Sequence, residues 1–308
     1  MSANPVITGV YCAAATPVAA DLSVDVRLFT AHCRHLLDNG CDGIALLGTT
    51  GEANSFSMAE RRAILEGVVE GGIAPDRLMP GTGVCAIPDT VELTRHALSL
   101  GVTRVVMLPP FYYKGASEDG LFAAYSEVIE RIGDDRLKIV LYHIPQMSGV
   151  PITLGLMRRL VARYPSTVVG VKDSAGDLDN MKATVDALPG FSVLAGADPL
   201  LLPLLQHGGA GCITATSNLI ADSLAQVFRH FRDPAQSAAV EQAQARINAW
   251  RTLSNSYGAQ IATIKAMIAA QAGTDSWRGV RPPLTPLPEA ELVDLSTKLA
   301  PLLQEAVS

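Results

Sequence analysis

Short runs of apolar residues alternate along the chain with longer segments in which apolar residues recur at helical spacing. Eight of the short runs lack polar alternation and are rich in Val, Ile and Leu, which is typical of strands buried on both faces of a parallel sheet. These runs are residues 9–15, 42–48, 77–83, 104–110, 138–144, 167–173, 191–196 and 210–214. The segments between them have the periodicity of amphipathic helices.

Several of the helical segments also carry signals for where a helix begins or ends. Residues 24–40 finish on a glycine, a common C-terminal stop. Residues 57–72 begin at Ser57, and Glu60 follows at the spacing of a capping box. Further helices are predicted at 88–101, 117–133, 153–165, 177–190 and 198–209. Successive strands lie roughly 30 residues apart, which is the size of a βα unit with its loops.

Eight strands that alternate with helices predict a (β/α)8 barrel, also called a TIM barrel. A doubly wound parallel sheet is the alternative, but it rarely needs eight strands, and no GxGxxG motif follows the first run. Beyond the last run only helical patterns continue, through 219–232, 235–256, 259–273 and 289–306. We therefore expect a barrel domain over residues 1–230 and a C-terminal helical extension, packed on the barrel, over residues 231–308.

Composition narrows the class of protein. The 308 residues are 48% hydrophobic and 18% charged, which provides ample material for a core. A net charge of −6 and an aromatic content of 5% disfavour nucleic acid as a partner. No apolar run approaches the roughly 20 residues that span a bilayer, and the N-terminus is a poor signal peptide. The five cysteines are scattered without a CxxC motif, so we expect reduced thiols and a cytoplasmic location.

The candidate chemistry lies where the apolar runs end, because the active site of such a barrel lies at the carboxyl ends of its strands. Lys172 directly follows the apolar run VVGV, so its stem begins in the barrel interior. Burial disfavours a charged ammonium group, and a neutral amine can attack a ketone to form a Schiff base. The alternative is a lysine whose stem is buried while its ammonium group reaches solvent.

Other polar residues occupy neighbouring strand ends. Tyr142 holds the matching position on the adjacent run, where it is either a proton relay or a core tyrosine. His143 points the other way, toward the helices, which favours packing. Thr49 and Thr50 lie in the turn GTTGE, whose hydroxyl and N–H groups suit a carboxylate, although turn formation and capping explain the same residues. Glu52 is either a catalytic group or a residue that orients this turn, and the second role is favoured.

The positions of the histidines disfavour a metal site. A metal-dependent barrel gathers His and carboxylates at strand ends, whereas five of the six histidines lie in predicted helical segments. Only His32 and His35 share a helical face. The stretch GGAGCIT at 208–214 resembles a phosphate-binding loop, so a phosphate-bearing substrate or a flavin remains a minor alternative.

The motifs GTTGE, PPFYY, YHIP followed by SG, and GVKDSAG, in this order and spacing, resemble the dihydrodipicolinate synthase/N-acetylneuraminate lyase family. The resemblance covers nearly the whole chain. It implies a (β/α)8 barrel with a C-terminal helical extension and a homotetramer built as a dimer of dimers. It also implies metal-independent class I aldolase chemistry through a lysine–pyruvate Schiff base, with no cofactor beyond that covalent imine.

The resemblance implies roles for individual residues. Lys172 in GVKDS corresponds to the Schiff-base lysine, and Tyr142 in YHIP to the tyrosine that relays protons. Thr49 and Thr50 correspond to the pair that holds the pyruvate carboxylate, and Thr49 also links the tyrosines by hydrogen bonds. Tyr113 in PPFYY corresponds to a tyrosine lent to the adjacent subunit's site.

Ile213 in GCIT corresponds to the residue whose backbone lies near the pyruvate. Three positions depart from the patterns of known subgroups. In synthases that make the lysine precursor, the segment after the tyrosine reads like YNVPGRTG, and its arginine binds the aldehyde's carboxylate. Here the segment reads YHIPQMSG, and Met147 cannot form a bidentate pair with a carboxylate. The sialic-acid lyase pattern is not met either, because GTTGE replaces GSTGE and Pro199 replaces an acidic residue.

The sequence thus resembles a branch that includes aldolases and dehydratases of 2-keto-3-deoxy sugar acids and related 2-oxo acids. The leading hypothesis is a Schiff-base lyase that cleaves or forms a bond beta to the keto group of pyruvate or another 2-oxo acid, with an aldehyde as second substrate. One alternative is 4-hydroxy-tetrahydrodipicolinate synthase, which condenses pyruvate with aspartate semialdehyde; Met147 predicts poor turnover of that aldehyde. Another is a non-catalytic barrel that binds 2-oxo acids, against which the presence of both Lys172 and Tyr142 argues.

Overall fold

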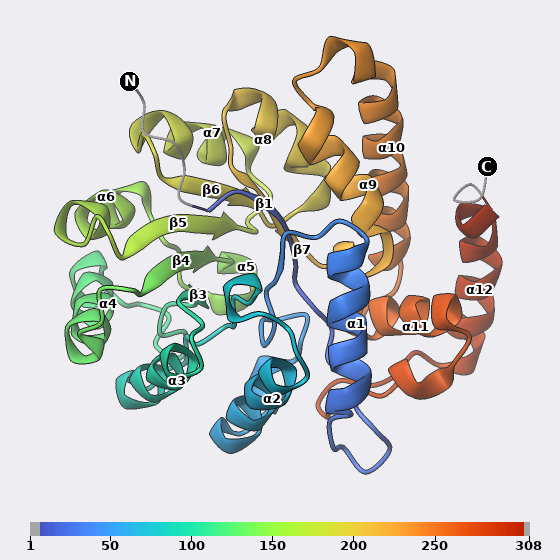
Figure 1. The fold of residues 1–308 in the computed structure, drawn as a ribbon, viewed down its shortest axis with the longest axis horizontal. Helices are drawn as coiled ribbons and strands as arrows, with labels where there is room; N and C mark the ends of the chain where they lie inside the picture. Colours follow the sequence, from blue (N-terminus) through green and yellow to red (C-terminus); the bar gives the residue numbers. More distant parts are fainter. Residues whose placement is uncertain (1–6, 305–308) are drawn as a thin grey trace.

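The computed structural model describes residues 7–304 and shows parallel strands at the centre with helices around them (Figure 1). The strands pair in the order β2-β1-β7-β6-β5-β4-β3, and every pair is parallel. Their bounds are β1 Gly9–Cys12, β2 Gly43–Ile44, β3 Arg104–Met107, β4 Lys138–His143, β5 Val168–Asp173, β6 Ser192–Ala195 and β7 Gly211–Thr214.

The apolar run at 77–83 joins the two ends of this order without forming a regular strand. Leu78 bridges β2 and Gly81 bridges β3, both in the parallel direction. Pro80 lies between them and has no N–H group to donate, which interrupts the hydrogen-bond ladder. The ring is therefore completed by seven regular strands and one irregular segment. The predicted (β/α)8 barrel is confirmed, and the prediction of a strand at 77–83 is corrected to two isolated bridges.

Helices cover the outside of the ring, and their ends fall within three residues of the predicted ones. They are α1 Val26–Asp38, α2 Met58–Glu70, α3 Ile87–Ser99, α4 Glu118–Ile132, α6 Leu154–Arg163, α7 Leu178–Ala187, α8 Leu201–His207 and α9 Ser217–His230. The predicted capping box is present, because the backbone N–H of Glu60 donates to Ser57 Oγ while that of Ser57 donates to the Glu60 carboxylate. A short helix that the pattern did not predict, α5 Pro145–Ser148, follows β4.

Three further helices, α10 Ser237–Ser254, α11 Gln260–Ala272 and α12 Glu289–Gln304, follow the barrel and lie along one side of it (Figure 1). α10 packs against α9, and α12 contacts both α10 and α11. Across residues 7–304, no helix has the length and apolar character needed to cross a membrane.

Alternation along the strands decides which side chains face the inside of the ring. On β4, Val140 and Tyr142 belong to a cluster in the barrel interior, whereas Ile139 and Leu141 pack beneath the helices. Ile213 of β7 joins the same interior cluster. The strand pattern thus directs Tyr142 and Ile213 inward.

Candidate active site

Strands β4 and β5 bring Lys172 and Tyr142 together at their carboxyl ends. The two residues are direct partners in the parallel pairing of these strands. Nζ of Lys172 lies 4.1 Å from the centre of the Tyr142 ring. Because Lys172 is only 5% exposed, its amine stays within the barrel mouth and does not extend to bulk solvent.

The hydroxyl group of Tyr142 has a second neighbour, Oγ1 of Thr49, at 3.3 Å. Thr49 stands in the turn that follows β2. Burial raises the pKa of Tyr142, but the positive charge of Lys172 and hydrogen bonds with Thr49, Lys172 and Ser174 outweigh it, so the pKa is lowered from its usual 10.0. A phenol with a lowered pKa gives up its proton more readily, which suits an acid–base group.

A cavity of about 370 Å³ opens at this end of the barrel. Turns that follow the strands form most of its wall, and residues from α10, α11 and the loop between them complete it. Met147 on α5 also lines it and is 63% exposed, so no cation stands at this position. Five of the predicted site residues line the cavity, namely Lys172, Tyr142, Thr49, Thr50 and Ile213.

Tyr113, the remaining predicted residue, does not line the cavity of its own chain. It lies on the loop after β3 and is 77% exposed, beside Tyr112, which is 73% exposed. The two rings meet edge to face with centroids 5.3 Å apart. Such an exposed aromatic pair is available to another molecule, so a role of Tyr113 in a neighbouring subunit's site stays a prediction.

Glu52 connects the turn that carries Thr49 and Thr50 to the C-terminal part of the chain. This residue adopts a left-handed conformation with φ of 57°. Its Oε1 accepts a hydrogen bond from Nζ of Lys265 on α11 at 2.6 Å, and both side chains are fully buried. Its Oε2 accepts from the backbone N–H of Arg281 at 2.9 Å. Glu52 does not line the cavity, in agreement with its expected role in orienting the turn.

Two other sequence signals have packing explanations. Nδ1 of the buried His143 accepts a hydrogen bond from the backbone N–H of Ile152 at 3.0 Å, as expected for a histidine that points toward the helices. In the glycine-rich stretch before β7, Gly211 has φ of 138°, and an added Cβ there would lie 2.0 Å from the carbonyl oxygen of Gly9. The close approach of β1 and β7 therefore requires this glycine.

One cation in the cavity wall was not found from the sequence. Arg251 lies in the last turn of α10, and its side chain is 21% exposed. Its Nη1 lies 3.4 Å from Oδ2 of Asp198, which is fully buried. With its oxygen turned toward the guanidinium, the amide of Gln260 accepts from Nη1 at 2.7 Å. No strand pattern or motif surrounds Arg251, so periodicity gave no signal for it.

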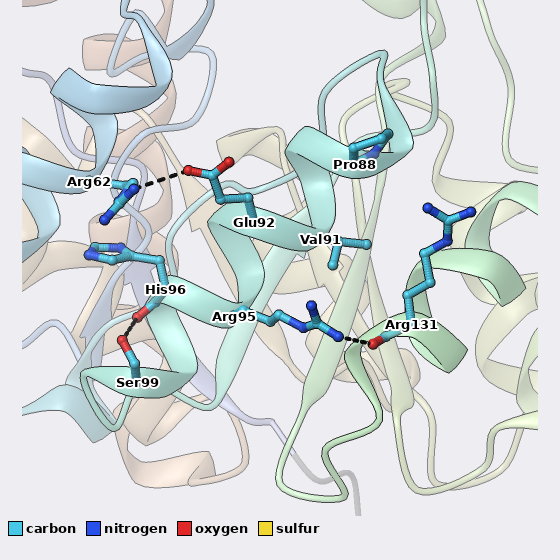
Figure 2. Close-up of a pocket in the computed structure, with 8 residues that line it drawn as sticks. All are labelled: Arg62, Pro88, Val91, Glu92, Arg95, His96, Ser99 and Arg131. Carbon is cyan, nitrogen blue, oxygen red and sulfur yellow. Dashed lines mark hydrogen bonds and ion pairs between the residues drawn. The ribbon is translucent and has the colours of Figure 1, made fainter.

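A larger hollow of about 600 Å³ lies on the outside of the barrel, between α2, α3 and α4 (Figure 2). Its charged groups already have partners. Arg62 pairs with Glu92 at 3.0 Å, and Arg95 donates a hydrogen bond to the backbone carbonyl of Arg131 (Figure 2). None of the predicted site residues lines this hollow. We therefore place the candidate active site at the barrel mouth, around Lys172.

Comparison with known proteins finds relatives that match over most of the chain. The model of the dihydrodipicolinate synthetase family matches residues 6–301. An uncharacterized DapA-like lyase from Chloroflexus aurantiacus is 36% identical over 290 residues, covering 93% of this chain and 94% of that protein. A 4-hydroxy-tetrahydrodipicolinate synthase from Listeria monocytogenes is 35% identical over 207 residues, covering 67% of this chain and 69% of that protein.

Solved structures share the whole architecture. A dihydrodipicolinate synthase from Agrobacterium tumefaciens matches with a TM-score of 0.87 and 30% identity, covering 95% of this chain and 99% of that one. YagE is a prophage protein of the dihydrodipicolinic acid synthase family from E. coli K12, solved in complex with pyruvate. It matches with a TM-score of 0.88 and 26% identity, covering 96% of this chain and 99% of its own. The match extends over both the barrel and the C-terminal helices.

Proposed function

The chain belongs to the dihydrodipicolinate synthetase family of lyases, and on that premise we propose that it forms a Schiff base with pyruvate or another 2-oxo acid through Lys172. The bond that it cleaves or forms lies beta to the keto group, and the second substrate is an aldehyde. The observation that carries this proposal is the placement of Lys172. Its buried amine lines a cavity directly beside a tyrosine whose pKa is lowered.

The reaction begins when the neutral amine of Lys172 attacks the keto carbon. The resulting carbinolamine loses the former keto oxygen as water, which leaves a protonated imine. In the cleavage direction the bond between C3 and C4 breaks, its electron pair moves into the imine to form an enamine, and C4 departs as the aldehyde. Protonation of the enamine at C3 and hydrolysis of the imine release the 2-oxo acid and restore the lysine. No external cofactor takes part in these steps.

Tyr142 moves the protons in this scheme. Its phenol gives a proton to the carbinolamine oxygen as that oxygen leaves as water, and the phenolate then takes the proton from the C4 hydroxyl group. The contact with Thr49 at 3.3 Å and the positive charge that the Lys172 nitrogen carries in the protonated imine support this role, because both favour the phenolate. Tyr113 of an adjacent subunit joins this relay in the homotetramer that we propose.

Substrate binding is divided between the two sides of the cavity. The hydroxyl and N–H groups of Thr49 and Thr50 bind the carboxylate of the 2-oxo acid, and the backbone of Ile213 borders its keto carbon. At the opposite end, Met147 offers no charge to an aldehyde. This supports an aldolase or dehydratase of 2-keto-3-deoxy sugar acids over a 4-hydroxy-tetrahydrodipicolinate synthase.

Borohydride trapping tests the imine directly. Reduction in the presence of pyruvate should add one pyruvate-derived group per chain, and peptide mapping should locate it on Lys172. Lys172→Met should abolish the adduct, whereas Lys182→Met, on α7 outside the barrel, should leave it unchanged. An adduct on another lysine such as Lys114, or no adduct at all, would contradict the proposal.

A substrate comparison then separates the two kinds of lyase. Purified enzyme is assayed with pyruvate plus aspartate semialdehyde and, side by side, with 2-keto-3-deoxy sugar acids. We expect the second class to be turned over with the higher kcat/KM. Efficient use of aspartate semialdehyde would favour the synthase alternative, and an adduct without turnover of either class would favour a non-catalytic binding barrel.

A further inference from the structure

The charges in the cavity wall suit a substrate with two acidic ends. Among the lining residues in the described part of the chain, Lys172 and Arg251 are the cations, and no Asp or Glu accompanies them. In the proposed mechanism the charge of the Lys172 imine is balanced by the 2-oxo acid's own carboxylate. Arg251 then has no matching anion inside the cavity.

The buried neighbour of Arg251 neutralises it only in part. Asp198 meets the guanidinium through one oxygen at 3.4 Å and does not line the cavity. Burial raises the pKa of Asp198, against the opposing effect of the Arg251 charge. A guanidinium has five N–H donors, so the contacts with Asp198 and Gln260 leave donors for a ligand. Together these contacts fix the guanidinium at the wall, which reduces the entropy lost when a ligand binds.

The position of this cation differs from the one that Met147 occupies. Met147 belongs to α5, directly after β4, whereas Arg251 reaches the cavity from the C-terminal helices together with Gln260 at the start of α11. A substrate that uses Arg251 must therefore extend from the imine toward α10 and α11. A planar guanidinium binds a carboxylate through two parallel hydrogen bonds, a geometry that a thioether cannot offer.

We propose that Arg251 determines specificity by binding a second carboxylate, at the end of the substrate distal to the keto group. The substrate class is then a dicarboxylic 2-oxo acid, cleaved to pyruvate and an aldehyde that bears the second carboxylate or dehydrated without loss of that carboxylate. The inference rests on the proposed function, since it takes the imine at Lys172 as its starting point.

The test uses borohydride trapping with matched pairs of 2-oxo acids. 2-Oxoglutarate is compared with 2-oxopentanoate, and 2-oxoadipate with 2-oxohexanoate. The two acids of each pair have the same number of carbon atoms and differ only in the distal carboxylate. The measured quantity is the concentration that gives half-maximal adduct. We expect it to be at least about tenfold lower for the diacid in one pair or both, as is typical of a charge-assisted hydrogen bond.

Variants on α10 assign the preference to one residue. Arg251→Met should remove the diacid preference, so that the diacid and the monoacid of each pair give half-maximal adduct at similar concentrations. Arg251→Lys keeps the charge but not the planar fork, so it should retain only part of the diacid preference. If Arg251→Met fails to fold, an undiminished preference in Arg251→Lys contradicts the proposal. Arg246→Met is the matched control, because Arg246 also lies on α10, has a 19% exposed side chain and pairs with Asp222 at 3.1 Å, but does not line the cavity. Its diacid preference should equal that of the wild type.

A missing pyruvate adduct and a missing diacid preference lead to different conclusions. Wild-type protein without a pyruvate adduct overturns the proposed function and this inference with it. A pyruvate adduct with no diacid preference in either pair overturns the inference alone. A preference that persists in both Arg251 variants also overturns it, because the second carboxylate is then bound elsewhere.

Discussion

At the scale of single residues, the phenol of Tyr142 lies between two groups that favour its ionised form, Thr49 and Lys172. Tyr142→Phe removes only the hydroxyl group and nearly preserves the side-chain volume. We expect kcat to fall by roughly 10²–10⁴, the usual contribution of general acid–base catalysis, while thermal unfolding stays close to that of the wild type. Steady-state kinetics and a melting curve check this, and full activity in a well-folded variant would refute the role.

Individual residues also show which parts of the candidate site can be recognised from the sequence. Lys172 and Tyr142 are recognisable because a strand position fixes both the direction of a side chain and the end of the barrel at which it lies. Arg251 has no such signal. It lies in an amphipathic helix, and whether a helical side chain reaches the barrel mouth depends on how α10 docks, which the local pattern does not encode.

At the scale of elements, α1 is joined to α9 and to the C-terminal segment through His32. Its Nε2 donates to Oδ1 of Asn218 at 3.0 Å, since that oxygen also accepts from the backbone N–H of Ala15. Its ring lies 4.6 Å from that of Trp277. Burial lowers the pKa of His32 to about 4 from the usual 6.5, so the folded protein holds the ring neutral.

This contact predicts a loss of stability in mild acid. The pKa of His32 is lower in the folded state, so the unfolded chain binds the proton first as the pH falls. The stabilisation is complete above pH 6.5 and is lost progressively toward about pH 4. Between pH 7 and pH 5 the wild type should lose about 2 kcal/mol more unfolding free energy than His32→Gln, at about 1.4 kcal/mol per unit. Urea unfolding of both proteins measures this; equal losses would contradict the assignment.

The elements themselves were largely predictable, because strands buried on both faces and amphipathic helices have different periodicities. The exceptions are local. At 77–83 the apolar composition predicted a strand, but Pro80 lacks the donor that a continuous ladder needs. α5 is too short to show a helical period, and its residues Pro145–Ser148 were interpreted through their chemistry alone.

The ion pair between Glu52 and Lys265 connects positions 213 residues apart in the chain. Lys265→Met should cost about 3–5 kcal/mol of unfolding free energy, because it leaves a buried carboxylate without its partner. Glu52→Gln combined with Lys265→Met should recover much of that loss, since neither partner then carries a charge. Guanidinium unfolding of the single and double variants gives the coupling energy. Purely additive effects would show that the pair does not act as a unit.

At the scale of the whole molecule, the exposed pair Tyr112 and Tyr113 predicts an assembly of chains. Two aromatic rings more than 70% exposed on one loop form an apolar surface that a second copy can bury. Light scattering at micromolar concentration should give at least a dimer, and the proposed arrangement is a tetramer. Tyr112→Ser combined with Tyr113→Ser should shift the protein toward smaller species and lower its activity. A monomer with intact activity would count against both the assembly and the role of Tyr113.

The link between Glu52 and α11 also affects when the enzyme becomes competent during its synthesis. Lys172 and Tyr142 leave the ribosome well before α10 and α11 do. Until α11 arrives, the buried carboxylate behind the threonine turn has no counter-charge, and Arg251 is not yet in place at the wall. A nascent or truncated chain that ends before α11 therefore carries the reactive lysine on an unfinished site. If Lys172 forms the proposed imine, full reactivity toward 2-oxo acids should therefore arise only after α11 has been synthesised.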